Sequence, residues 1–231
     1  MLAAALKSFS QLPTRPFRAV LLKSLGLTVG LLVALIVAIE TVFGALVVLP
    51  GWLETTIQWL GGLGLVVASV FLIAPITSLI AGLYLDDIAA EVEKRHYPND
   101  PPGRELPMLT AMGTSLKFGL VVMAVNILAL FLLLIPGVNV VAFLAANGYL
   151  LGREFFELAA FRHLPQAEAK RLRKANRLRV FLSGLAIAGL VSVPVLNLLT
   201  PLFATAFMVH TYKDIAARQA RRAPGAAAGS V

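Results

Sequence analysis

Two short motifs of the form Pro-x-x-Asn are the first residues in this chain whose spacing suggests chemistry. They are Pro136-Gly137-Val138-Asn139 and Pro194-Val195-Leu196-Asn197, and they interrupt uncharged runs at residues 118–152 and 180–212. A helix that begins at such a break has backbone N–H groups without helical partners and a positive dipole end. Asn139 and Asn197 could each cap one N–H, and the remaining groups could face an anion. The alternative is that these residues only form a turn and a cap.

A second candidate for chemistry is a pair of arginines ahead of the first apolar run. Arg15 and Arg18 follow closely on Pro13 and Thr14. Arginine carries a planar fork of N–H donors that suits tetrahedral oxyanions. These side chains are therefore predicted to gather an anion at the membrane surface. The alternative is that they bind lipid headgroups and set the orientation of the chain.

The composition places these motifs in a membrane protein. Of the 231 residues, 58% are hydrophobic and 14% are charged, against about 25% charged in an ordinary soluble domain. The absence of cysteine excludes disulfides, thiol catalysis and thiolate metal sites. His96, His163 and His210 are scattered without ligand spacing, and the chain has no nucleotide-binding loop. We therefore expect an integral membrane protein that is not an enzyme and has no metal or cofactor.

Two long helices are predicted in the first part of the chain. Residues 25–49 form the first apolar span, and residues 55–85 form a second run that Pro75 is expected to kink. The helical pattern continues through residues 86–95, which predicts a second helix that projects into water without interruption. The residues from Tyr97 to Gly103, rich in proline, indicate a loop.

The two interrupted runs are predicted to form helical hairpins. In the first run, residues 118–135 would span about 27 Å as a helix and residues 139–152 about 21 Å, whereas a bilayer core is about 30 Å thick. The second arm is short for a crossing, which favours a hairpin that enters the membrane and returns. The alternative is two ordinary spans, the second extended by its amphipathic tail.

Charge distribution predicts the orientation of the chain. Residues 1–23, 153–179 and 213–231 carry net charges of +4, +5 and +3, whereas the turns near residues 50, 136 and 194 have no basic residue. The positive-inside rule then places both termini in the cytoplasm. Residues 166–179 are basic and amphipathic, which predicts a helix along the membrane surface beside anionic headgroups rather than a nucleic-acid interface.

These elements form one predicted membrane domain over residues 1–231. Its expected parts are a basic segment (1–24), two long helices (25–97), a first hairpin (105–163), the surface helix (166–179), a second hairpin (180–217) and a disordered tail (218–231). Gly26-x-x-x-Gly30 and Gly148-x-x-x-Gly152 have the small-residue spacing that permits close helix contact, a spacing common in membrane helices and found where helices self-associate.

The sequence resembles the CysZ sulfate permeases of the etoposide-induced-protein superfamily from about residue 9 to residue 214. The resemblance rests on three stretches: Ile73-Ala74-Pro75-Ile76, Ile135-Pro136-Gly137, and Val193-Pro194-Val195-Leu196-Asn197-Leu198. It implies two spanning helices, two half-penetrating hairpins, and a homo-oligomer in a bacterial inner membrane. It also implies that the protein passes sulfate inward for cysteine synthesis.

The same resemblance implies a location for sulfate binding. The family has a short Gly-Leu-Arg motif ahead of its first membrane helix, and Pro13-Thr14-Arg15 holds that place here. The arginine matches, whereas proline stands where the family has glycine. We therefore expect an anion site at Thr14, Arg15 and Arg18 and a sulfate permease or anion channel in contact with the lipid bilayer. The alternative is a membrane scaffold or bilayer-shaping protein that transports nothing.

Overall fold

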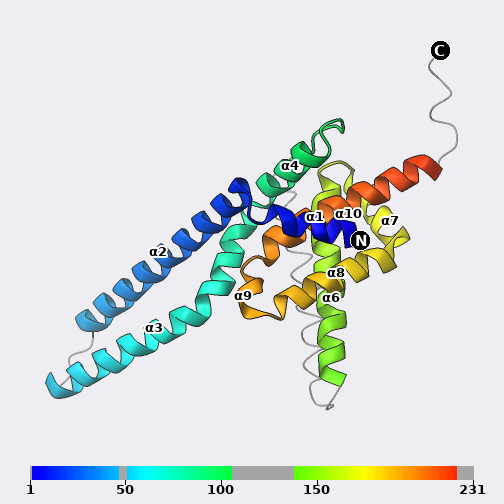
Figure 1. Ribbon diagram of the computed structural model, residues 1–231. Helices are drawn as coiled ribbons and strands as arrows, with labels where there is room; N and C mark the ends of the chain where they lie inside the picture. The colour runs from blue at the N-terminus through cyan, green and yellow to red at the C-terminus, as the bar shows by residue number, and fades with distance from the viewer. Residues whose placement is uncertain (1, 47–50, 106–137, 223–231) are drawn as a thin grey trace.

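The computed structural model describes residues 2–46, 51–105 and 138–222, and these residues contain helices and loops but no strand. Figure 1 shows a long helical arm and a second group of helices that meet at one end of the molecule. The helices are α1 (Leu2–Gln11), α2 (Arg15–Leu46), α3 (Gly51–Gly82), α4 (Leu85–His96), α6 (Val138–Phe161), α7 (Gln166–Ala175), α8 (Arg177–Val191), α9 (Pro194–Asn197) and α10 (Thr200–Arg222). This confirms the predicted all-α membrane fold.

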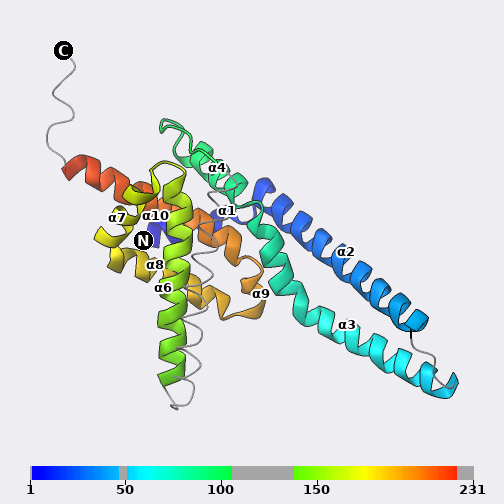
Figure 2. The ribbon, with the colours of Figure 1, turned by 180° about the vertical axis from the view of Figure 1, so that it is seen from behind.

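The arm is the antiparallel pair α2 and α3, which lie side by side along most of their length (Figure 2). Arg15–Ala45 and Gly51–Ile73 are long and apolar enough to cross a membrane. Large apolar side chains project from both helices, and Leu35, Val37 and Phe71 are at least 48% exposed. An apolar surface of this size has no stable place in water, so these helices require contact with lipid or with another apolar surface.

The second long helix ends sooner than the sequence predicted. The structure has a turn at Leu83 and Tyr84, and α4 then begins at Leu85. Asp86 and Asp87 lie in the first turn of α4, where the positive end of the helix dipole favours acidic side chains. The prediction of one uninterrupted helix is therefore wrong, because this pair of acids begins a new helix. The loop predicted at residues 97–103 is present.

The first predicted hairpin is described only in its second arm. Its turn, including Pro136 and Gly137, lies outside the described residues. The second arm, α6, continues past Gly152 to Phe161. It has 24 residues and a length of about 36 Å. This helix is long enough for a full crossing, so helix length does not favour the half-penetrating hairpin over the alternative.

The second interrupted run forms three helices instead of two. Helix α8 ends at Val191, the short α9 occupies residues 194–197, and α10 begins at Thr200. Proline is favoured in the first turn of a helix, and Pro194 begins α9. Helix α10 then continues to Arg222, which includes the first residues of the predicted tail.

The predicted surface helix corresponds to α7, which ends at Ala175, and residues 177–179 begin α8. Ala169 and Leu172 of α7 are buried against the protein core. The apolar face of α7 therefore packs on the protein and is not free to enter the bilayer, as a surface-bound helix requires. Its exposed residues, which include Arg171 and Lys174, remain at the surface.

Glycines allow α6 and α8 to pack closely. A side chain added at Gly184 of α8 would collide with the backbone of Gly148 and Gly152, and its Cβ would lie 2.6 Å from the Gly152 nitrogen. The Gly148-x-x-x-Gly152 motif therefore serves a contact within the chain. By contrast, side chains added at Gly26 and Gly30 of α2 would meet nothing within 4 Å.

Candidate functional site

The predicted anion entrance lies at the turn between α1 and α2. Thr14 precedes α2, its hydroxyl donates to the Gln11 carbonyl at 2.6 Å, and its own carbonyl accepts the Arg18 N–H at 3.0 Å. Arg15 is the first residue of α2, and both Arg15 and Arg18 are exposed. Among the described residues neither guanidinium has an ion-pair partner. The turn therefore presents two cations close to the N-terminal end of the first span.

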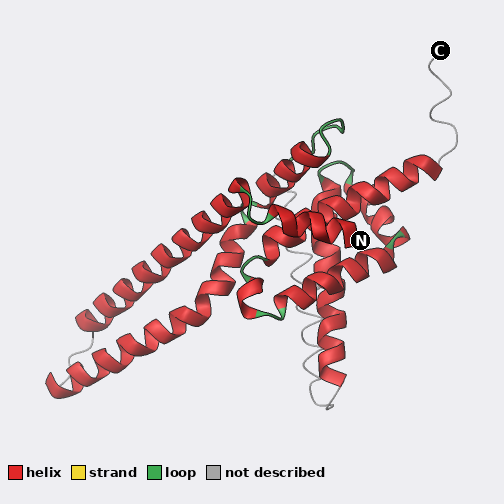
Figure 3. Cartoon of the chain, viewed as in Figure 1, coloured by secondary structure: helices red, strands yellow, loops and turns green. Residues whose placement is uncertain are grey.

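The second bend differs from a simple half-helix with a free amide end. The Asn197 N–H donates to Val193, the Leu199 N–H to Leu196 and the Phe203 N–H to Leu199. Asn197 is the last residue of the short α9 and does not cap a following helix. Since α10 begins three residues later, at Thr200, the cap assumed for Asn197 is wrong. These backbone bonds form successive turns between α8 and α10 (Figure 3).

The corresponding residue of the first bend, Asn139, is the second residue of α6. Pro136 and Gly137 of the same bend lie outside the described residues. Pro194 and Asn197 lie at the two ends of α9, near the beginning of α10.

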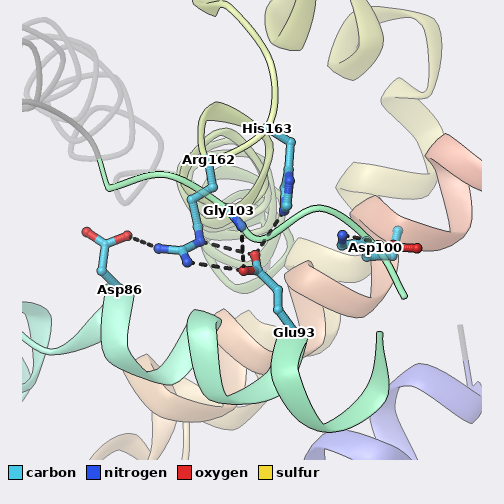
Figure 4. A network of polar contacts seen from close by, with 7 residues as sticks. Asp86, Glu93, Asp100, Gly103, Arg162 and His163 are labelled. Atoms are coloured by element: carbon cyan, nitrogen blue, oxygen red, sulfur yellow. Dashed lines mark hydrogen bonds and ion pairs between the residues drawn. The ribbon is translucent and has the colours of Figure 1, made fainter. Parts of the chain in front are cut away.

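The densest polar cluster lies elsewhere, between α4, α6 and the loop after α4 (Figure 4). Arg162 Nε lies 3.1 Å from Glu93 Oε1, Arg162 Nη2 lies 3.1 Å from Glu93 Oε2, and Nη1 reaches Asp86 at 2.6 Å. His163 Nε2 lies 2.9 Å from Glu93, and the Gly103 N–H donates to the same carboxylate at 3.2 Å. Both Glu93 and Arg162 are buried.

This cluster holds its carboxylate in the charged form. Burial by itself raises the pKa of Glu93, but hydrogen bonds from His163 and Arg162 and their charges outweigh burial and lower it to about 2. A Cβ at Gly103 would lie 2.8 Å from Arg162 Nε and 2.9 Å from the Glu93 oxygens. Only glycine therefore lets the loop approach so closely, and the paired charges join the loop to α4 and α6.

A second polar cluster joins α1, α4 and α10. Gln11 Nε2 lies 2.7 Å from His96 Nε2 and 3.0 Å from His210 Nε2. His210 Nδ1 lies 2.8 Å from the Tyr97 hydroxyl. Burial, His96 and Lys7 lower the pKa of His210 to about 4, so this imidazole is neutral at physiological pH.

Further ion pairs link other helices of this group. Lys213 of α10 reaches Asp100 at 2.9 Å, and Arg173 of α7 reaches Glu157 of α6 at 2.8 Å. Arg179 of α8 pairs with Asp214 of α10. Since these contacts hold helices together, the charges in them have a structural role.

The sequence did not predict either polar cluster. The three histidines appeared scattered because His96 and His210 are 114 positions apart, yet their ring centroids lie 5.0 Å apart. One signal for the first cluster was present in the sequence, because Arg162 and His163 come directly after the long α6 segment. Among the described residues no group of three or more acidic or histidine side chains could hold a metal ion.

The described residues also include two open grooves. One has a volume of about 620 Å³ and lies along the loop that carries Gly103 and Arg104, beside Arg162 and His163. The other, of about 320 Å³, lies between the far halves of α2 and α3 and includes Glu40 and Gln58. Neither of these two grooves includes Arg15, Arg18 or Asn197.

Comparison with known proteins adds the family. No curated protein matches the chain. Residues 4–201 match the family described as Sulfate transporter CysZ/Etoposide-induced protein 2.4. The matched region runs from α1 to the start of α10 and includes both long apolar helices, the polar clusters on α4 and α6, and the second bend. The chain therefore belongs to the family of the sulfate transporter CysZ and etoposide-induced protein 2.4.

Proposed function

We propose that the protein is a permease or channel that carries sulfate or a related oxyanion across the bacterial inner membrane. Family membership over residues 4–201, together with two helices able to span a bilayer, is the observation that carries this proposal. The sulfate would supply sulfur assimilation and cysteine synthesis. The basic segments would face the cytoplasm with both termini, and the protein would act as a homo-oligomer.

The arginines before the first span are the proposed anion entrance. Arg15 and Arg18 are exposed and lack an ion-pair partner among the described residues, so their charges remain available to a ligand. They also lie at the N-terminal end of α2, where the helix dipole adds a positive potential. Thr14 adds a hydroxyl, although that hydroxyl already donates to the Gln11 carbonyl.

The proline bends are the proposed path through the membrane. Pro136, Gly137 and Asn139 would form one bend, and Pro194 and Asn197 the other. Because Asn197 ends α9 and does not cap α10, the second bend would act through N–H donors that face the path, among them the side-chain amide of Asn197.

Sulfate uptake into liposomes containing the purified protein tests the proposal. The double variant Arg15→Ala with Arg18→Ala should lower uptake at least tenfold, since the loss of even one charge-assisted hydrogen bond of about 1.5–3 kcal/mol corresponds to a factor of about ten or more. The matched control is Arg171→Ala with Lys174→Ala, which removes two exposed basic residues of α7 instead.

The controls separate three outcomes. Equal loss in both double variants would mean that net surface charge matters and would remove the entrance. Unchanged uptake in the arginine variant would also remove it. No flux above empty liposomes for the parent protein would favour the alternative, a membrane scaffold, for which the exposed basic residues of α7 and α10 supply contacts to anionic headgroups.

Single cysteines test the route, because the chain has no cysteine of its own. Gly137→Cys and Val195→Cys can be labelled from either side of the membrane by a charged thiol reagent. Labelling of both positions from the cytoplasmic side only would support re-entrant hairpins. Labelling of Gly137→Cys from the opposite side only would support two full spans.

A further inference from the structure

Helix α1 is held to the protein by apolar contacts and by one polar side chain. The Phe9 ring lies 4.5 Å from the ring of Phe203 in α10, and Ala4 and Ala5 pack against the core. Ser8 and Gln11 are the buried residues of α1, and the hydroxyls of Ser8 and Ser10 bond only to carbonyls within the helix. Among the side-chain hydrogen bonds described for α1, those of Gln11 are the ones that reach other helices. They end on His96 at the end of α4 and on His210 in α10.

With its amide nitrogen toward the two rings, Gln11 matches neutral imidazoles, and its buried Oε1 has no hydrogen-bond partner among the described residues. One amide nitrogen lies 2.7 Å and 3.0 Å from the two Nε2 atoms, so each of its N–H groups has an imidazole acceptor. Protonation would place an N–H on Nε2, directed at an amide that is itself a donor. It would also place two cations on rings whose centroids are 5.0 Å apart.

The surrounding charges do not compensate for such protonation. Lys7 of α1 and Arg95 of α4 act on the imidazoles, and both are positive. The acids Asp100 and Asp214 raise the pKa of Tyr97, which contacts His210. Asp100 is paired with Lys213, and Asp214 with Arg179 and Arg218.

Helix α1 has the features of a helix that binds at the membrane interface. Leu2 and Leu6 are 81% and 66% exposed, and the helix carries Lys7 as its one charged residue. A short amphipathic helix with a basic residue suits the interface of a membrane with anionic lipids.

We propose that Gln11, His96 and His210 form a proton-sensitive latch. With both imidazoles neutral the latch holds α1 against α4 and α10, and their protonation releases α1 to the membrane interface. Released α1 remains joined to α2 through the turn at residues 12–14, so it moves as a tethered arm.

The direction of the pH effect follows from the histidines. The pKa of His210 is about 4 with α1 attached, whereas a solvated histidine has a pKa near 6.5. Attachment is therefore fully stable above pH 6.5 and weakens as the pH falls toward 4. For His210 alone, the ratio of attached to released α1 should fall roughly 30-fold between pH 7.5 and pH 5.

Spin-label distances in lipid nanodiscs with anionic lipid measure this release. Labels on Ser10→Cys in α1 and Ala217→Cys in α10 are attached at pH 7.5, and the sample is then moved to pH 5. We expect one short, narrow distance at pH 7.5 and a longer, broader population at pH 5. A control pair, Ala90→Cys in α4 with Ala217→Cys, should keep the same distance at both values and so report that the core stays folded.

The isosteric variant Gln11→Glu is the decisive comparison. Its carboxylate would accept hydrogen bonds from protonated imidazoles, so acidification should strengthen attachment and reverse the pH response. A parent distance that does not change between pH 7.5 and 5 would overturn the latch. Release of Gln11→Glu in acid to the same extent as the parent would overturn it too. Transport does not enter the measurement, so the result is independent of the proposed sulfate function.

Discussion

The α2–α3 arm and the α4–α6–α10 core differ in the side-chain contacts that stabilise them. The arm exposes apolar side chains along most of its length, and a bond of 2.9 Å between Thr77 and Thr28 is the side-chain hydrogen bond described between its two helices. The core contains buried ion pairs, including Arg162 with Glu93. It also contains buried aromatic rings such as Phe156 and Phe207.

This difference separates two sources of stability. The arm depends on an apolar environment outside the chain, because its own helices cover little of its apolar surface. The core obtains its stability from packing, charge pairs and close backbone contact within the chain. Substitutions should therefore have large effects in the core and small effects in the arm, and the following three variants test that contrast in decreasing order.

The largest effect is expected for Arg162→Leu. The substitution leaves Glu93 buried without its guanidinium, and loss of one partner from a buried ion pair costs about 3–5 kcal/mol. Thermal unfolding in detergent should show a midpoint lowered by about 10 °C. The matched control is Arg104→Leu in the same loop region, where the side chain is exposed and the expected change is about 0.5 kcal/mol or less. Equal shifts for the two variants would contradict the special role of the buried pair.

An intermediate effect is expected for Gly184→Ala at the contact between α6 and α8. The new methyl group would collide with the backbone of Gly148 and Gly152, and overpacking of this kind costs about 1–3 kcal/mol. The unfolding midpoint should fall by about 5 °C. Gly189→Ala in the same helix has nothing within 4 Å and should be neutral or slightly stabilising. A neutral Gly184→Ala would show that the two helices can move apart without cost.

The smallest effect is expected for Thr77→Val in the arm. The variant removes the hydrogen bond to Thr28, and such bonds between membrane helices contribute about 0.6 kcal/mol on average. The midpoint should change by about 2 °C. Thr41→Val is the control, because that hydroxyl bonds only to Val37 in its own helix. A shift for Thr77→Val as large as that of Arg162→Leu would break the contrast between arm and core.

The sequence predicted the arm better than the core. Long apolar runs fix the existence of α2 and α3 because a bilayer demands uninterrupted helices of that length. The turn at Leu83 and Tyr84 was missed because hydrophobic periodicity continues across it, while the new helix begins through the acids Asp86 and Asp87. The four residues of α9 were likewise too short to produce a periodic signal.

The polar clusters could not be predicted from the sequence, because their members lie far apart along the chain. Gln11, His96 and His210 come from three helices, and only the packing of α1 on α4 and α10 makes them neighbours. Arg15 and Arg18 were predicted from local spacing before a span, and the structure leaves both exposed there. Their role in anion binding stays a prediction, as do the roles of Pro136, Gly137, Asn139, Pro194 and Asn197.

Because α3 is long, a small change of direction at the short turn between α3 and α4 corresponds to a large displacement at the far end of the arm. Helix α3 has 32 residues and a length of about 48 Å. A change of about 10° in direction at Leu83 and Tyr84 would therefore shift its far end by about 8 Å. Tilt of this kind is the general way in which a helix longer than the bilayer core is accommodated.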